Sequence, residues 1–203
     1  ERMRRMFGML NTLLHETNEN EFNKLFSRIE KYENISDNME LEIANYLNKV
    51  SEGRLSSESK LEIRGMLREV TEIESIGDSC YNLARTINRK RSGGNDFTEK
   101  QYEHIHQMMQ LTDDALAHMI AVVEDEHHAV DVNKSFNIEN EMNNYRAQLK
   151  NQNVVDVNNK EYDYQMGVHY MDLIGECEKL GDYVVNVVEA RTNVKEKKVG
   201  DNR

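Results

Sequence analysis

The sequence predicts an all-α protein built as two three-helix bundles in tandem. Proline is absent from all 203 residues, so no predicted helix is interrupted by a residue that lacks a backbone N–H. The composition, 38% apolar and 31% charged, suits helices that bury one face and expose the other. A motif of the first half returns in the second half, which indicates a duplicated unit. We therefore expect an elongated bundle of long antiparallel helices.

The first unit is expected to span residues 1–94, with a truncated first helix. Apolar residues recur there every three or four positions. This spacing predicts three helices, at about residues 1–17, 18–51 and 57–92. Gly53 is placed to act as the C-cap of the second helix, and Ser56 or Ser57 as the N-cap of the third.

The second unit is expected to span residues 95–192. The same spacing predicts helices at about residues 98–124, 129–152 and 160–192. Thr98 is a suitable N-cap for the first of them. Short connections make sequence neighbours antiparallel. Residues 193–203 are expected to form a flexible charged tail.

Charge and composition exclude several classes of function. The formal net charge of −11 argues against nucleic acid as a partner, because phosphate backbones are held by clusters of lysine and arginine. The sequence holds neither a glycine-rich phosphate loop nor a Ser-His-Asp arrangement. It also has no run of 18 apolar residues that would span a membrane. We expect no enzymatic activity and no small-molecule substrate.

The repeated motif places acidic side chains on one face of a helix in each half. Its two copies, 104 positions apart, are Glu74, Gly77, Asp78 and Asn82, and Glu178, Gly181, Asp182 and Asn186. Residues i, i+4 and i+8 drift only about 40° per step around a helix, so the three polar residues of each copy form one stripe. The glycine costs about 1 kcal/mol relative to alanine, which indicates close approach of a neighbouring segment.

A second polar pair precedes each motif. Glu33 and Asp37 stand four residues apart on the helix predicted at 18–51, and Glu139 and Asn143 stand 106 positions after them. Antiparallel packing of neighbouring helices would bring the first pair beside the first motif, so that four carboxylates meet. Crowded carboxylates repel one another, and oxygen ligands favour Mg, Mn, Ca or Fe. The first unit is therefore expected to bind a cation, and the second unit has a weaker set.

These residues resemble PhoU proteins, the regulators of bacterial phosphate uptake. The resemblance covers about residues 18–192 and rests on the glycine-aspartate motif, which occurs twice. It implies a self-associating regulator of phosphate transport that binds a metal ion, which we take to be Fe, Mn, Mg or Zn. The implied ligands are Glu33, Asp37, Glu74, Asp78, Glu139, Glu178 and Asp182, supported by Asn82, Asn143, Asn186, Gly77 and Gly181.

The first residues suggest a finer assignment. Arg2, Arg4 and Arg5 open a short helix without a capping signal, so we expect the sequence to be a segment of a longer chain. This start resembles the PhoU-like domain that follows the membrane portion of bacterial sodium/phosphate cotransporters. The resemblance implies a partner in the transporter membrane domain, in the same chain or complex. It also implies a location on the cytoplasmic side of the inner membrane.

Three other interpretations stay open on the sequence. The chain could be a free-standing PhoU-type regulator of phosphate uptake, or a purely structural helical association domain whose acidic stripes are solvated. A di-iron enzyme would need Glu-x-x-His motifs on different helices. The candidates Glu103–His106 and Glu124–His127 lie at the two ends of one predicted helix, about 31 Å apart.

Overall fold

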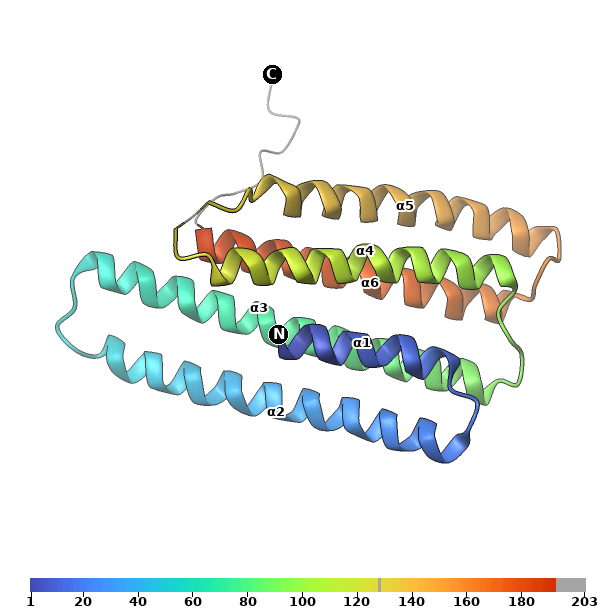
Figure 1. The fold of residues 1–203 in the computed structure, drawn as a ribbon, viewed down its shortest axis with the longest axis horizontal. Coiled ribbons are helices and arrows are strands. Elements are labelled where there is room, and N and C mark those ends of the chain that lie inside the picture. Colours follow the sequence, from blue (N-terminus) through green and yellow to red (C-terminus); the bar gives the residue numbers. More distant parts are fainter. Residues whose placement is uncertain (128, 193–203) are drawn as a thin grey trace, which may run out of the picture.

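The computed structural model describes residues 1–127 and 129–192, which form six helices and no strand. Figure 1 shows them as an elongated bundle. The helices are α1 Arg2–His15, α2 Glu19–Ser51, α3 Ser57–Ser92, α4 Glu99–Glu124, α5 Asn133–Asn158 and α6 Tyr164–Thr192. The predicted all-α class is confirmed. Over the described residues, none of these helices combines the length and the hydrophobicity needed to cross a bilayer.

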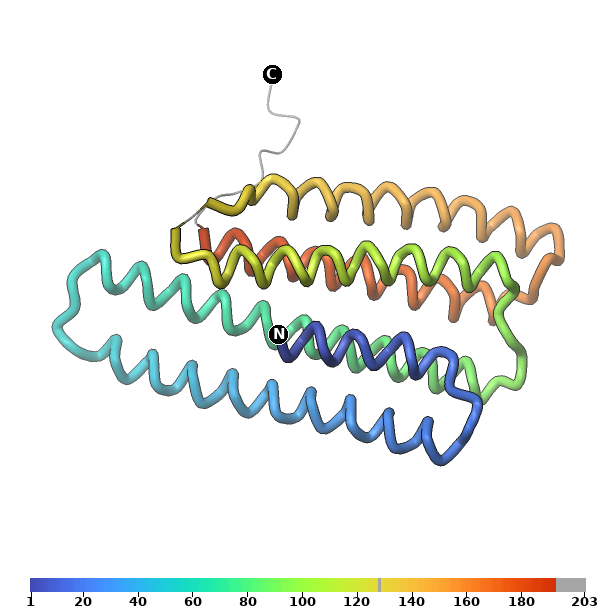
Figure 2. Tube along the Cα trace, viewed as in Figure 1, coloured from blue at the N-terminus to red at the C-terminus, as the bar shows by residue number. Residues whose placement is uncertain are grey.

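The helices pack as two units that lie side by side, with their long axes nearly aligned (Figure 2). Helices α1, α2 and α3 contact one another, and so do α4, α5 and α6. Contacts of α3 with α6 and of α1 with α4 join the two units. These four helices form the centre, and α2 and α5 form the two outer edges.

Side-chain caps fix several of the helix starts. The side chain of Asn18 accepts a hydrogen bond from the Glu21 N–H, and that of Ser56 accepts one from the Ser59 N–H, both at 3.1 Å. Thr98 forms a reciprocal capping box with the residue three positions later. Each cap satisfies a backbone donor that has no partner within its own helix. The predicted starts at Ser56 and Thr98 are confirmed.

Helix α5 begins and ends later than the predicted range of 129–152. Its end is a Schellman motif, in which Lys160 adopts a left-handed φ of 62°. The N–H of Lys160 bonds to the Val157 carbonyl at 3.1 Å, and that of Glu161 bonds to the Asp156 carbonyl at 3.0 Å. The sequence did not reveal this end because glycine usually fills the left-handed position. The asparagines at the predicted end lower helix propensity by well under about 1 kcal/mol each, too little to stop the helix.

Two smaller predictions also differ from the structure. Glu52 rather than Gly53 is the C-cap of α2, and Gly53 does not take the positive φ of a glycine cap. Helix α6 begins at Tyr164, four residues after the predicted start. The predicted tail at 193–203 lies outside the described residues. The division of the chain between residues 94 and 95 stays a prediction.

The core runs without a break from one unit to the other. Its largest fully buried side chains come from all six helices. They are Met6, Leu10, Leu13, Ile29, Ile76, Ile105, Met108, Leu116, Met142, Ile174, Leu180 and Val184. Because burial of apolar surface is the main favourable term in folding, we expect both units to unfold together.

Replacing Leu180 by alanine tests this shared core. The Leu180 side chain is fully buried in α6, so Leu180→Ala should lower the free energy of unfolding by about 2–5 kcal/mol. Leu41 is 58% exposed on α2, and Leu41→Ala should change it by no more than about 0.5 kcal/mol. Urea unfolding followed by circular dichroism measures both values. A separate transition for each unit, or equal effects of the two variants, would contradict a single continuous core.

Candidate metal centre

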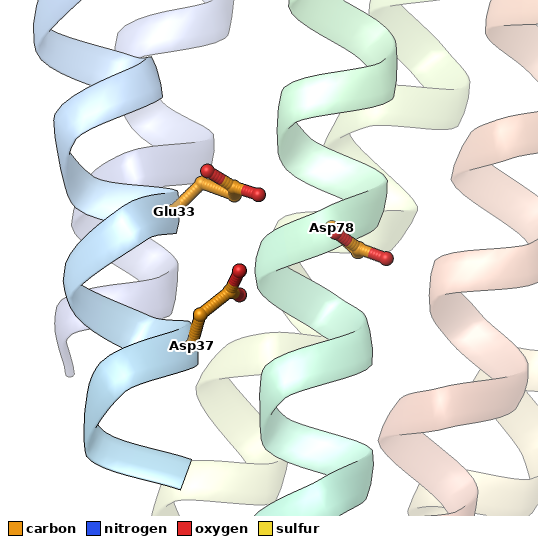
Figure 3. Close-up of side chains that lie close together, drawn as sticks. All are labelled: Glu33, Asp37 and Asp78. Carbon is orange, nitrogen blue, oxygen red and sulfur yellow. The ribbon is translucent and has the colours of Figure 1, made fainter. Parts of the chain in front are cut away.

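Three carboxylates from two helices meet in the first unit. Glu33 and Asp37 project from α2 toward α3, which carries Asp78 (Figure 3). One carboxylate oxygen of each residue lies within 4.8 Å of the others. The i, i+4 spacing on α2 puts Glu33 and Asp37 on the same face of that helix. The Glu33 and Asp37 pair was predicted to lie beside the first motif, and Asp78 is the motif residue that it contacts most closely.

Gly77 allows α3 to approach its neighbours beside this cluster. A Cβ at Gly77 would lie 3.3 Å from Met3 Sδ of α1 and 3.4 Å from Ser36 Oγ of α2. Such distances are at or inside ordinary van der Waals contact. The glycine therefore brings α2 and α3 together at the level of Asp37 and Asp78. The predicted close approach at this position is confirmed.

Glu74 borders the cluster and carries the largest shift among its carboxyl groups. Burial is the main cause, followed by the charges of Asp78, Asp37 and Glu40, and together they raise the pKa of Glu74 to about 7. Burial and the charge of Asp37 also raise the pKa of Glu33. Each shift means that the negative form is disfavoured where it stands. A cation would relieve this cost directly.

The cluster has little neutralisation of its own. Asp37 Oδ1 is buried and has no hydrogen-bond partner among the described residues. Within residues 1–127 and 129–192, no lysine or arginine forms an ion pair with Glu33, Asp37, Glu74 or Asp78. An unpaired oxygen that faces other carboxylates is the donor that a hard cation would use.

The corresponding residues of the second unit are arranged differently. Arg146 Nε lies 3.6 Å from Glu178 Oε2. Burial raises the pKa values of Glu178 and Asp182, and the charge of Arg146 offsets part of this rise. The Asn143 side-chain amide donates a hydrogen bond to Glu139. In the part of the chain that the structure describes, the only group of three or more metal-ligating side chains close enough to share an ion is in the first unit. Glu139, Glu178 and Asp182 are not brought into such a group.

A reversal of charge between the units explains this difference. Arg146 stands 106 positions after Glu40, the same interval that relates Glu139 to Glu33. The first unit thus has the negative charge of Glu40 where the second unit has the positive charge of Arg146. This signal is present in the sequence, three residues after Asn143.

A family model for the PhoU domain matches residues 1–87 and 105–190. The chain belongs to the PhoU domain family. Its PhoU fold also resembles the crystal structure of the phosphate transport system regulatory protein PhoU from Streptococcus pneumoniae. The TM-score is 0.73 and the sequence identity 15%, over 93% of this chain and 86% of that one. Comparison with curated protein sequences gives no match.

Membership of the PhoU family supports the expectation that the chain is not an enzyme. The histidine of one Glu-x-x-His candidate is engaged elsewhere, because His106 Nε2 lies 2.6 Å from His15 Nε2 of α1. The neighbouring His104 Nδ1 lies 2.8 Å from the Tyr170 hydroxyl of α6. His106 and His104 therefore serve contacts between helices, and His127 of the other candidate follows the end of α4.

The motif asparagines lie at the interface between the PhoU repeats. Asn82 donates a long hydrogen bond of 3.5 Å to Glu176 Oε1 on α6, and Asn186 donates one of 3.0 Å to Glu72 Oε2 on α3. The expectation that Asn82 and Asn186 support the acidic sets is therefore corrected. A drift of about 40° for every four residues turns them by about 80° from the motif glutamate, away from α2 and α5.

Gly181 repeats the role of Gly77 in the second PhoU repeat. A Cβ there would lie 3.0 Å from both Cε and Sδ of Met142 on α5. Met142 stands 106 positions after Ser36, the residue that faces Gly77. Both motif glycines thus set the spacing between the third helix of a repeat and its neighbours.

Ionisation of Glu74 predicts how stability depends on pH without metal. In the folded chain this carboxyl keeps its proton to about pH 7, whereas in the unfolded chain it loses the proton near pH 4.3. Between these values the folded state binds more protons, so the free energy of unfolding should fall as pH rises. In urea unfolding with EDTA at pH 5 and pH 7.5, Glu74→Gln should show a smaller fall than the wild type.

Glu62→Gln is the matched control, because Glu62 is exposed on the same helix. It should keep the wild-type dependence on pH. An equal flattening in both variants, or none in Glu74→Gln, would show that the charge of Glu74 is not disfavoured in the fold.

Proposed function

We propose that this chain regulates phosphate transport as a PhoU-type protein and binds a cation through Glu33, Asp37, Glu74 and Asp78. The observation that carries the metal part is the meeting of Glu33, Asp37 and Asp78 within 4.8 Å. Their charges lack an ion pair within the described residues. The regulatory part rests on the PhoU family match.

The donor set suits a hard cation. All candidate ligands are carboxylate oxygens, which favour Mg, Mn, Ca or Fe over metals that prefer thiolate. Three oxygens that lie within 4.8 Å of one another are close enough to contact one ion after small movements of their side chains. We favour Mn or Fe over Zn, because no histidine or cysteine belongs to the group.

Phosphate transport is the process in which we place the chain. The Streptococcus pneumoniae relative is described as a phosphate transport system regulatory protein, and the family model is described as a PhoU domain. The comparisons therefore favour a PhoU-type uptake regulator over a cotransporter domain. The partners we propose are a phosphate transporter at the cytoplasmic side of the inner membrane and further copies of this chain.

The arginines at the start of α1 contact other helices of the bundle, so they do not favour attachment to a membrane. Arg4 forms a two-point ion pair with Asp113 of α4, at 2.9 and 2.8 Å, and Arg2 Nη1 lies 3.2 Å from Met39 Sδ. Hydrogen bonding to Arg5 is the largest cause of a lowered pKa of Tyr32. The three arginines thus contact the bundle itself. A cotransporter domain remains the finer alternative.

Cation binding should stabilise the protein by an amount that grows with the logarithm of the cation concentration above Kd. At a Mn²⁺ concentration about 100 times Kd, the free energy of unfolding should rise by about 2.7 kcal/mol. Asp37→Asn removes a candidate ligand and should weaken Mn²⁺ binding by more than the roughly 10–100-fold that loss of an outer partner costs. Calorimetric titration of the EDTA-treated protein measures the affinity.

Glu178→Gln is the matched control for that titration, because it makes the same kind of change in the second repeat and should leave Mn²⁺ affinity unchanged. Equal loss in both variants would contradict the assignment to the first unit. Absence of binding to the wild type would favour the structural association domain.

The charge reversal predicts that a second site can be created. The double variant Asn143→Asp/Arg146→Glu gives the second repeat the acids that the first repeat holds at Asp37 and Glu40. Elemental analysis after dialysis against Mn²⁺ should then rise from one ion to about two per chain. The single variant Asn143→Asp keeps the arginine and should stay at one. An unchanged count in the double variant would show that more than these charges separates the repeats.

Regulation itself is tested in a bacterium that lacks its own PhoU. Expression of this chain should restore repression of phosphate uptake at high phosphate, measured with labelled phosphate. Asp37→Asn should reduce the repression if the cation is required. Full repression by Asp37→Asn would separate regulation from metal binding, and no effect of the wild type would contradict the regulatory proposal in that host.

A further inference from the structure

Two histidines from different repeats face each other where α1 ends. His15 is the last residue of α1, and His106 lies on α4. Their Nε2 atoms are 2.6 Å apart, and their ring centroids are 4.8 Å apart. Both residues are exposed. The pair is therefore a polar contact between the first repeat and the second that protons of the solvent can reach.

The contact between the two rings depends on how many protons they carry. A hydrogen bond between two Nε2 atoms needs one N–H donor and one lone pair. Two neutral imidazoles meet this requirement, and so does one neutral imidazole with one imidazolium. When both rings are protonated, each Nε2 carries a hydrogen and neither can accept. A second proton therefore replaces the hydrogen bond by repulsion between two cations.

The groups packed around the pair disfavour positive charge on His15. Burial is the main cause of its lowered pKa, followed by the charges of His106 and of Lys90 on α3, and the charge of Asp96 opposes them. Asp96 also forms an ion pair with Lys90 and accepts a hydrogen bond of 2.7 Å from the Tyr102 hydroxyl. The Tyr102 ring lies 5.3 Å from His15 and 6.2 Å from His106 between centroids. The Asp96 carboxylate is thus shared with partners other than the two histidines.

Other charged groups near the pair have partners of their own. Arg91 of α3 donates hydrogen bonds to the two backbone carbonyls that directly follow α1. The Glu16 carboxylate accepts a hydrogen bond of 2.7 Å from the backbone N–H two residues later. Glu103 stands one turn before His106 on α4, and its charge acts on His104. The end of α1 is therefore held to α3 through Arg91 and to α4 through His106.

We propose that the His15–His106 pair is a pH-sensitive contact between the two repeats. At neutral pH the shared proton holds the last turn of α1 to α4. In mildly acidic solution a second proton enters the pair and the contact opens. Leu10 and Leu13 of α1 are almost completely buried in the core, so the opening is confined to the last turn of α1 and the segment that connects it to α2.

The sign of the effect separates this pair from Glu74. The pKa of His15 is lowered in the folded chain, so between that value and about 6.5 the unfolded chain binds more protons. The contribution of His15 to the free energy of unfolding therefore falls as the pH is lowered. The raised pKa of Glu74 acts in the opposite direction. A global measurement would add the two effects, so the contact is best followed by a local one.

Hydrogen exchange followed by mass spectrometry measures the contact locally. Protection factors of the amides in residues 11–18 are compared at pH 7.5 and pH 5 with EDTA present, after correction for intrinsic exchange rates. In the wild type they should fall by about two- to tenfold at pH 5, the change expected when one hydrogen bond is lost. Protection that is equal at the two pH values would overturn the proposal.

His15→Asn tests whether the pair causes this fall. The variant removes one imidazole and keeps a polar side chain, so protection of residues 11–18 should no longer depend on pH. His127→Asn is the matched control, because His127 is exposed beyond the end of α4, and it should keep the wild-type fall. Circular dichroism checks that both variants fold. A fall that persists in His15→Asn would overturn the proposal.

Titration of His15 by NMR gives a second measurement that does not depend on opening. His106→Asn removes a neighbouring positive charge, so the pKa of His15 should rise toward its ordinary value. An unchanged pKa would show that the two rings do not share a proton and would also overturn the proposal. Because all these measurements are made without metal, the histidine pair can fail its test while the cation proposal stands.

Discussion

Packing of α3 against α6 is the interaction on which the rest of the structure depends. Ile76 and Leu180 are fully buried in these helices, and the Asn82–Glu176 and Asn186–Glu72 hydrogen bonds cross between them as an equivalent pair. Because α3 and α6 meet through these faces, the motif aspartates Asp78 and Asp182 are turned toward α2 and α5. The motif thus serves two purposes, since its asparagine joins the repeats and its aspartate is available for a cation.

The two repeats share a fold but have diverged where the first one carries its candidate cation site. Glu40 and Asp37 have Arg146 and Asn143 as their counterparts, so the second repeat neutralises its own acids. The first repeat lacks such a counter-charge, which is why the proposed cation is assigned to it alone.

Local signals in the sequence predict much of the fold and part of the site. The caps at Ser56 and Thr98 and the i, i+4 spacing of Glu33 and Asp37 involve neighbours in sequence, and the structure places them as predicted. The end of α5 was missed because Lys160 takes a conformation usually given to glycine. The role of Asn82 depends on the angle at which α6 crosses α3, which no local pattern contains.

The central claim is that the acids of the first repeat form a cation site and those of the second do not. Crystals grown with Mn²⁺ and measured at its absorption edge test this most directly. We predict one anomalous peak among Glu33, Asp37 and Asp78, and none beside Glu178, where Arg146 lies. A map without a peak at the first cluster, or with equal peaks at both, would contradict the account.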